Sequence, residues 1–227
     1  MSDLLHRVRA RQLRRFDFDR DEVLSRAVER LSRSRAPGAH SPLWTDARYG
    51  WGNEKWAAEE PYLAEVVRSA EASKGPILEC GSGLTTVLMG AVAARRGIEL
   101  HTLEHNPAWH ARVVAALGHV DASTTVVHLA PLRDYGDCEW YDAPVDRMPN
   151  HFALVVCDGP PASTRGGRGG LLPTVREKLA HDCSILLDDA NRAAERELIR
   201  NWSLALGGAA AINTTSRGFA RLTIGGR

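Results

Sequence analysis

The spacing of apolar segments is the feature that most constrains the fold of this chain. Short, nearly continuous apolar runs alternate with longer segments in which apolar residues recur every three or four positions. The expected strands are residues 76–80, 99–104, 124–129, 151–158, 183–187, 209–215 and 218–224, and the expected helices are 54–73, 84–96, 107–117, 171–180 and 192–206. This alternation predicts an α/β fold with a doubly wound, mostly parallel, seven-stranded sheet.

The last two expected strands differ from the others because only Ser216 and Arg217 join them. Parallel neighbours need a crossover of about a dozen residues, so this pair must form an antiparallel hairpin. A mostly parallel sheet that ends in a C-terminal antiparallel hairpin is a narrow class of α/β fold.

Residues 1–50 are expected to form an N-terminal helical extension and loop, before a single domain over residues 51–227. The first 35 residues contain ten arginines and six acids, with apolar residues at helical spacing. One interpretation is a helix packed on the domain with a solvated arginine face. The others are an arm that binds an acidic partner or covers a substrate site, and a surface for a homodimer.

Composition excludes several classes of protein. The net charge of the 227-residue chain is only +1, so a nucleic-acid partner is not expected. No apolar stretch approaches the roughly twenty residues of a membrane span, and the charged N-terminus does not resemble a signal peptide. The four cysteines form no CxxC pair and are expected to be free thiols. We therefore expect a cytoplasmic protein with a small-molecule substrate.

The residues at the ends of the first two strands predict a nucleoside-containing cofactor. Ligands of such sheets bind beyond the carboxyl ends of the strands. The first strand ends in Glu79-Cys80-Gly81-Ser82-Gly83, where glycines allow a tight turn and close approach of a ligand. Glu104 ends the second strand, 23 residues after Gly81, and an acid there can accept both ribose hydroxyls.

Two features favour S-adenosylmethionine over a dinucleotide. Thr86 stands where a dinucleotide site has its third glycine, and Glu79 would repel a pyrophosphate but suits an ammonium group. An NAD(P)-dependent oxidoreductase remains the alternative from another enzyme class, although the sequence has no Tyr-x-x-x-Lys pair. A second alternative is a non-catalytic module that binds S-adenosylmethionine or a partner without transferring the methyl group.

The motifs at residues 77–83, 102–105, 155–161 and 185–189 resemble those of class I S-adenosylmethionine-dependent methyltransferases, which have a Rossmann-like fold. The resemblance spans residues 51–224. It implies that Gly81 and Gly83 pass under the methionine part and that Glu104 binds the ribose. It further implies the remaining cofactor contacts, which are Glu79, Ser82, His105, the Ala130-Pro131-Leu132 turn and Asp158.

Three aspartates end the fourth and fifth expected strands and should converge. Asp158, Asp188 and Asp189 would repel one another unless protons or a cation intervene, and an all-oxygen set favours Mg²⁺ or another divalent cation. The pattern is similar to that of metal-dependent small-molecule O-methyltransferases, although the lysine of the catechol-type enzymes is missing after Asp158.

Some of these O-methyltransferases act on sugar hydroxyls. The resemblance to them implies that Asp188 is the catalytic base and that Asp158 faces the methyl donor and the acceptor. The alternative is that Asp189 caps the following helix and Asp188 makes buried hydrogen bonds. The expected reaction is methylation of a hydroxyl on a sugar or natural-product intermediate, with or without metal assistance. Residues 165–170 are expected to be a mobile lid or a flexible surface loop. Four aromatic residues are expected to line an acceptor pocket or to pack in the core: Trp44, Tyr49, Trp51 and Trp140.

Overall fold

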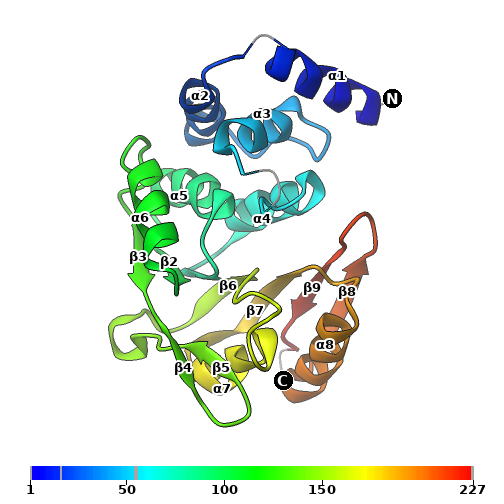
Figure 1. Cartoon of the computed structure of the whole chain (residues 1–227). Helices are drawn as coiled ribbons and strands as arrows, with labels where there is room; N and C mark the ends of the chain where they lie inside the picture. The colour runs from blue at the N-terminus through cyan, green and yellow to red at the C-terminus, as the bar shows by residue number, and fades with distance from the viewer. Residues whose placement is uncertain (1, 16, 54–55, 226–227) are drawn as a thin grey trace.

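A computed structural model describes residues 2–15, 17–53 and 56–225 of the protein. Its main strands are β1 (Ile77–Cys80), β2 (Leu100–Glu104), β3 (Thr125–Leu129), β6 (Phe152–Cys157), β7 (Leu179–Asp188), β8 (Ala209–Asn213) and β9 (Phe219–Thr223). They form one seven-stranded sheet in the order β3-β2-β1-β6-β7-β9-β8 (Figure 1). The predicted doubly wound sheet is confirmed.

The C-terminal hairpin is also confirmed. Strand β9 pairs antiparallel with both β7 and β8, whereas β3, β2, β1, β6 and β7 are parallel to one another. The strand order reverses between β1 and β6, because the chain first builds β2 and β3 on one side and then returns to the other. A crevice for ligands is expected at that reversal, beyond the carboxyl ends of β1 and β6.

Helices cover both faces of the sheet (Figure 1). They are α1 (Ser2–Arg15), α2 (Arg20–Arg33), α3 (Pro42–Trp51), α4 (Glu60–Ala72), α5 (Leu84–Arg96), α6 (Pro107–Leu117), α7 (Leu171–Val175) and α8 (Ala193–Leu206). One apolar cluster joins α2 to α6 on one face, and a second joins α7 and α8 on the other. Among the helices described, none has the length and apolar character needed to cross a membrane.

Helices α2 and α3 pack on the face formed by α4 and α5, and α1 packs on α3. Leu24, Val28 and Leu31 of α2 belong to the same apolar cluster as those two helices. The loop expected before residue 51 is instead mostly helix α3, in which Ser41 accepts a hydrogen bond from the Leu43 N–H and Pro42 occupies the first turn. The Ser-Pro start was the signal for this helix.

The four aromatic residues considered for an acceptor pocket are at most 4% exposed: Trp44, Tyr49, Trp51 and Trp140. They belong to the apolar clusters of the protein, so the core interpretation is the correct one. Burial of large aromatic rings removes much apolar surface from water and stabilises both layers.

Other boundaries also differ from the sequence prediction. Helix α4 begins at Glu60, because Pro61 fits only the first turn, and the expected start at Glu54 lies outside the described residues. Helix α7 ends at Val175, and β7 begins at residue 179, earlier than expected. The expected loop before residue 149 contains a small hairpin of β4 (Leu132–Asp134) and β5 (Glu139–Tyr141).

Candidate active site

The glycine turn after β1 lies directly against the turn after β6. Gly81 has a φ of +87°, and a Cβ there would be only 2.7 Å from the backbone nitrogen of Gly159. The Asp158 and Gly159 N–H groups both donate to the Cys80 carbonyl, at 2.9 and 2.7 Å. A side chain at either glycine would force these two strand ends apart. By contrast, a Cβ on Gly83 would meet nothing within 4 Å, which leaves the turn open to a ligand.

Glu79 supports this turn from inside the protein. Its side chain has no exposed surface and accepts hydrogen bonds from the hydroxyls of Thr85, Thr86 and Thr102 at 2.5, 2.6 and 2.8 Å. The Thr86 hydroxyl in turn accepts the Gly83 N–H at 2.9 Å. Burial raises the pKa of Glu79 to about 7, although the three hydroxyls act in the opposite direction. Thr86, which replaces the third glycine of a dinucleotide site, thus ties the turn to the carboxyl group of Glu79.

Glu104 lies at the mouth of the turn, where an acid for a ribose is expected. One carboxylate oxygen accepts the Ser82 N–H at 3.1 Å and the Ser82 hydroxyl at 2.7 Å, and the other accepts the Asn106 N–H at 2.8 Å. The Nδ1 atom of His105 is 3.2 Å from the second oxygen. These contacts fix the orientation of the carboxylate at the end of β2.

The residues expected beside an adenine also gather at this edge. The Ala130 N–H donates to the Glu104 carbonyl at 2.7 Å, which places the turn after β3 next to the end of β2. Pro131 is exposed and Leu132 is half-buried. The structure therefore brings every predicted cofactor residue to the carboxyl ends of β1, β2, β3 and β6, and their contacts with a cofactor stay a prediction.

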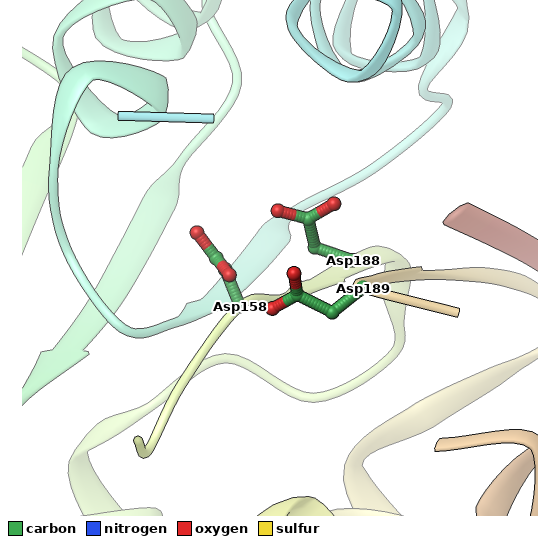
Figure 2. A group of neighbouring side chains, drawn as sticks. All are labelled: Asp158, Asp188 and Asp189. Atoms are coloured by element: carbon green, nitrogen blue, oxygen red, sulfur yellow. The ribbon is translucent and has the colours of Figure 1, made fainter. Parts of the chain in front are cut away.

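The three predicted aspartates converge at the ends of β6 and β7, as Figure 2 shows. The parallel register pairs Cys157 with Leu187, so Asp158 and Asp188 follow at neighbouring positions. One carboxylate oxygen from each of the three side chains lies within 4.8 Å of the others. Asp188 and Asp189 are buried, and Asp158 is half-buried.

A residue that the sequence analysis did not select, Arg168, compensates the charge of this cluster. Its guanidinium is 3% exposed and donates to one carboxylate oxygen each of Asp158 and Asp189, both at 3.1 Å. It also donates to the backbone carbonyls of Asp158 and Asp188, at 2.8 and 2.6 Å. Because it contacts the ends of both β6 and β7, Arg168 connects the two strands that carry the aspartates.

The glycines around Arg168 serve close packing. A Cβ on Gly170 would lie 2.4 Å from the Trp140 ring, and one on Gly166 would lie 2.4 Å from Cβ of Cys138. Residues 167–170 form a 3₁₀ turn that continues into α7. The structure thus places Arg168 in a packed turn instead of the mobile lid or flexible loop that the glycine content suggested.

The electrostatics of the cluster single out Asp188. Burial and the neighbouring Asp158 and Asp189 raise the pKa of Asp188 well above its ordinary value. Burial also raises the pKa of Asp158 to about 6, with Arg168 opposing the shift. Within the described part of the chain, no ion pair involves the Asp188 side chain, whereas Asp158 and Asp189 both pair with Arg168. Asp188 is therefore the carboxyl group best suited to accept a proton once it is ionised.

The contacts of Asp189 test two of the predicted roles, as a cap of helix α8 and as a metal ligand. Helix α8 has no side-chain cap, so the prediction that Asp189 caps it is wrong. Asp189 instead forms ion pairs with Arg168 at 3.1 Å and with Arg192 at 2.9 Å. Oxygen ligands alone would suit Mg²⁺. A guanidinium already bound to two of the three carboxylates does not fit a divalent cation, and the predicted metal site is not confirmed.

Residues 78–190, just under half of the chain, match the model of a family described as a methyltransferase domain. A comparison with curated proteins found no match. Among solved structures, SAH-bound methyltransferase PaMTH1 from Podospora anserina has a TM-score of 0.56 and 14% identity, over 90% of this chain and 96% of that one. SAH is S-adenosylhomocysteine, which remains when S-adenosylmethionine loses its methyl group.

Two further solved structures have the same fold, and the name of each includes a methyl acceptor. A candidate caffeoyl-CoA O-methyltransferase from Staphylococcus aureus has a TM-score of 0.55 and 12% identity, over 74% of this chain and 85% of that one. Precorrin-6y C5,15-methyltransferase from Geobacter metallireducens has a TM-score of 0.53 and 13% identity, over 75% and 90%. At these identities the likeness shows the fold. The family match over residues 78–190 supports methyltransferase as the class of protein.

Proposed function

We propose that this protein transfers the methyl group of S-adenosylmethionine to a hydroxyl oxygen of a small molecule, such as a sugar or a natural-product intermediate. The observation that carries the proposal is the position of the Asp188 carboxyl group. It is buried at the end of β7, beside Asp158, and Asp158 lies directly against the glycine turn. A proton acceptor thus stands next to the expected cofactor site.

The proposed reaction is an in-line displacement. The acceptor oxygen attacks the methyl carbon, the carbon–sulfur bond breaks, and S-adenosylhomocysteine leaves with the bonding electron pair. Asp188 takes the proton of the hydroxyl, which makes the oxygen a better nucleophile. Most of the acceleration would come from holding the oxygen in line with the sulfonium methyl. Asp158 and Asp189, paired with Arg168, would keep Asp188 in place.

Asp188 is the feature that favours oxygen as the methyl acceptor. The O-methyltransferase name of the Staphylococcus aureus neighbour agrees with it, but the precorrin enzyme is named for carbon positions. One fold therefore supports different acceptors, and the side chains of the site determine which acceptor reacts. A buried carboxyl group without an ion pair suits the removal of a hydroxyl proton.

Two measurements test the proposal. Calorimetry should show micromolar binding of S-adenosylmethionine and none of NAD⁺, which serves as the control ligand. Release of S-adenosylhomocysteine should then be followed with a panel of phenols, sugars and hydroxy acids. With any acceptor found, Asp188→Asn should lower turnover at least about 100-fold, the usual scale of general-base catalysis.

The matched control for Asp188→Asn is Asp182→Asn, a change at an exposed position on the same strand. It should leave turnover unchanged, and both variants should bind S-adenosylmethionine within a few fold of the parent protein. Full turnover in Asp188→Asn would remove Asp188 from the role of base. Binding of NAD⁺ instead of S-adenosylmethionine would refute the methyltransferase proposal as a whole.

A further inference from the structure

The charges at the ends of β6 and β7 are compensated from within the chain. Besides the three aspartates, Glu195 approaches the cluster, with one carboxylate oxygen 4.0 Å from the Arg168 guanidinium. Arg192 lies 2.9 Å from Asp189 and 3.6 Å from Glu195. Two guanidinium groups are therefore already present among these four acids. Of the two, Arg168 is buried and lies between Asp158 and Asp189.

A divalent cation and Arg168 would share the carboxylates of Asp158 and Asp189. A bound Mg²⁺ lies about 2.1 Å from a carboxylate oxygen. The Arg168 nitrogen is 3.1 Å from an oxygen of Asp158 and 3.1 Å from one of Asp189, so a cation on either of these two oxygens would be at most about 5 Å from that nitrogen. At that distance, in a buried site, the repulsion between like charges is weakly screened.

Arg168 cannot move away from the cluster without loss of other contacts. Its hydrogen bonds to the Asp158 and Asp188 carbonyls anchor the guanidinium to the backbone of two strands. Its own turn is fixed because Gly166 and Gly170 pack against Cys138 and Trp140 with no room for a side chain. The guanidinium is therefore a built-in part of the site.

We infer that Arg168 is the resident cation of this site, that it excludes divalent metals from the three aspartates, and that it positions Asp158 and Asp189 around Asp188. The site is accordingly metal independent in the native protein, and removal of the guanidinium charge creates a divalent-cation site. The part that concerns methyl transfer rests on the proposed function, whereas the part that concerns metal binding does not.

The test is a titration with Mn²⁺, followed by calorimetry and by electron paramagnetic resonance. The parent protein should not bind Mn²⁺ below millimolar concentration. Arg168→Gln, which keeps the length of the side chain but not its charge, should bind Mn²⁺ at least ten-fold more tightly. Adding Asp188→Asn to that variant should abolish the gain. Arg168→Lys should restore the exclusion of Mn²⁺ because the charge is restored.

Arg165→Gln is the matched control, since Arg165 belongs to the same segment but lies at the surface, where it pairs with Asp134. It should behave as the parent protein. Micromolar Mn²⁺ binding by the parent, lost on Asp158→Asn, would overturn the inference. So would a folded Arg168→Gln variant with no gain in Mn²⁺ affinity. If Arg168→Gln does not fold, the titrations of the parent and of Asp158→Asn still decide the question.

The same samples separate this inference from the proposed function. Failure to bind S-adenosylmethionine would refute the proposed function and leave the Mn²⁺ result unaffected. If methyl transfer is found, EDTA should not lower its rate in the parent protein. A rate that falls more than ten-fold with EDTA and returns with Mg²⁺ would overturn the inference while the proposed function stands.

Discussion

Replacing Gly81 and Gly83 one at a time by alanine should separate stability from cofactor binding within a single turn. At Gly81 the alanine would keep a φ of +87°, and its Cβ would meet the Gly159 backbone at 2.7 and 2.9 Å. The positive φ alone costs about 1–2 kcal/mol in a residue with a Cβ. Because backbone atoms cannot rotate away as a side chain can, the two turns must also separate. We expect a total loss of about 2–4 kcal/mol in the free energy of unfolding.

For a chain of this size, that loss corresponds to a decrease in Tm of about 5–15 °C. Gly83→Ala is the matched variant, because its Cβ would meet no atom within 4 Å. Gly83 is the N-cap of α5, a position where glycine is only modestly better than alanine. The free energy of unfolding should therefore change by less than about 1 kcal/mol. The added methyl group should nevertheless weaken S-adenosylmethionine binding at least ten-fold, since it occupies the ligand's approach.

Urea unfolding and calorimetric titration with S-adenosylmethionine measure the two effects independently. A Gly81→Ala protein as stable as the parent would show that the turns after β1 and β6 are not in close contact. A Gly83→Ala protein that binds the cofactor as tightly as the parent would show that the cofactor does not pass over this glycine. Either result would refute the assignment of different roles to the two positions.

Three further substitutions test the buried polar groups. Burial raises the pKa of Glu79 from 4.5 to about 7 in the folded protein. Between these two pH values, the folded protein therefore keeps a proton on Glu79 that the unfolded chain has lost. Glu79 should therefore contribute a fall in stability of about 3 kcal/mol as the pH rises from about 4.5 to above 7. Glu79→Gln should remove this contribution and so reduce the difference in stability between pH 5 and pH 8, measured by urea unfolding. The hydroxyl of Tyr62, which is 1% exposed, has no hydrogen-bond partner among the described residues, so Tyr62→Phe should be neutral or stabilising. A loss above about 1 kcal/mol would reveal a partner. Glu104→Ala should weaken S-adenosylmethionine binding at least ten-fold, and unchanged calorimetric affinity would exclude the ribose role.

The sheet could be predicted because its strands are short apolar runs separated by links of informative length. The two residues between 215 and 218 allow only a hairpin, and the structure pairs β8 with β9 antiparallel. The convergence of Asp158 and Asp188 could be predicted as well, because both residues stand at the ends of parallel strands, which meet at one edge of the sheet. Such predictions depend on chain connectivity and need no knowledge of side-chain packing.

The features that were missed depend on packing or on very short elements. Strands β4 and β5 have three residues each, too few for a periodic pattern. Residues 36–38, Ala-Pro-Gly, predict a loop, whereas helix α3 begins soon afterwards, at a start marked by Ser41 and Pro42. In both cases the local signal was weaker than the tertiary contacts that stabilise the element.

Arg168 shows why the charge of a site cannot be derived from the strand ends alone. Glycines around an arginine suggest a flexible segment, because glycine adds conformational freedom in the unfolded chain. The same glycines also permit contacts that no other residue allows, as at Gly170 against Trp140. Whether such a segment is flexible or tightly packed depends on the part of the protein that lies against it. The sequence does not identify that part. Here Cys138 and Trp140 pack against the turn and fix it, and the turn buries the guanidinium of Arg168. The guanidinium supplies the positive charge that the three neighbouring aspartates require.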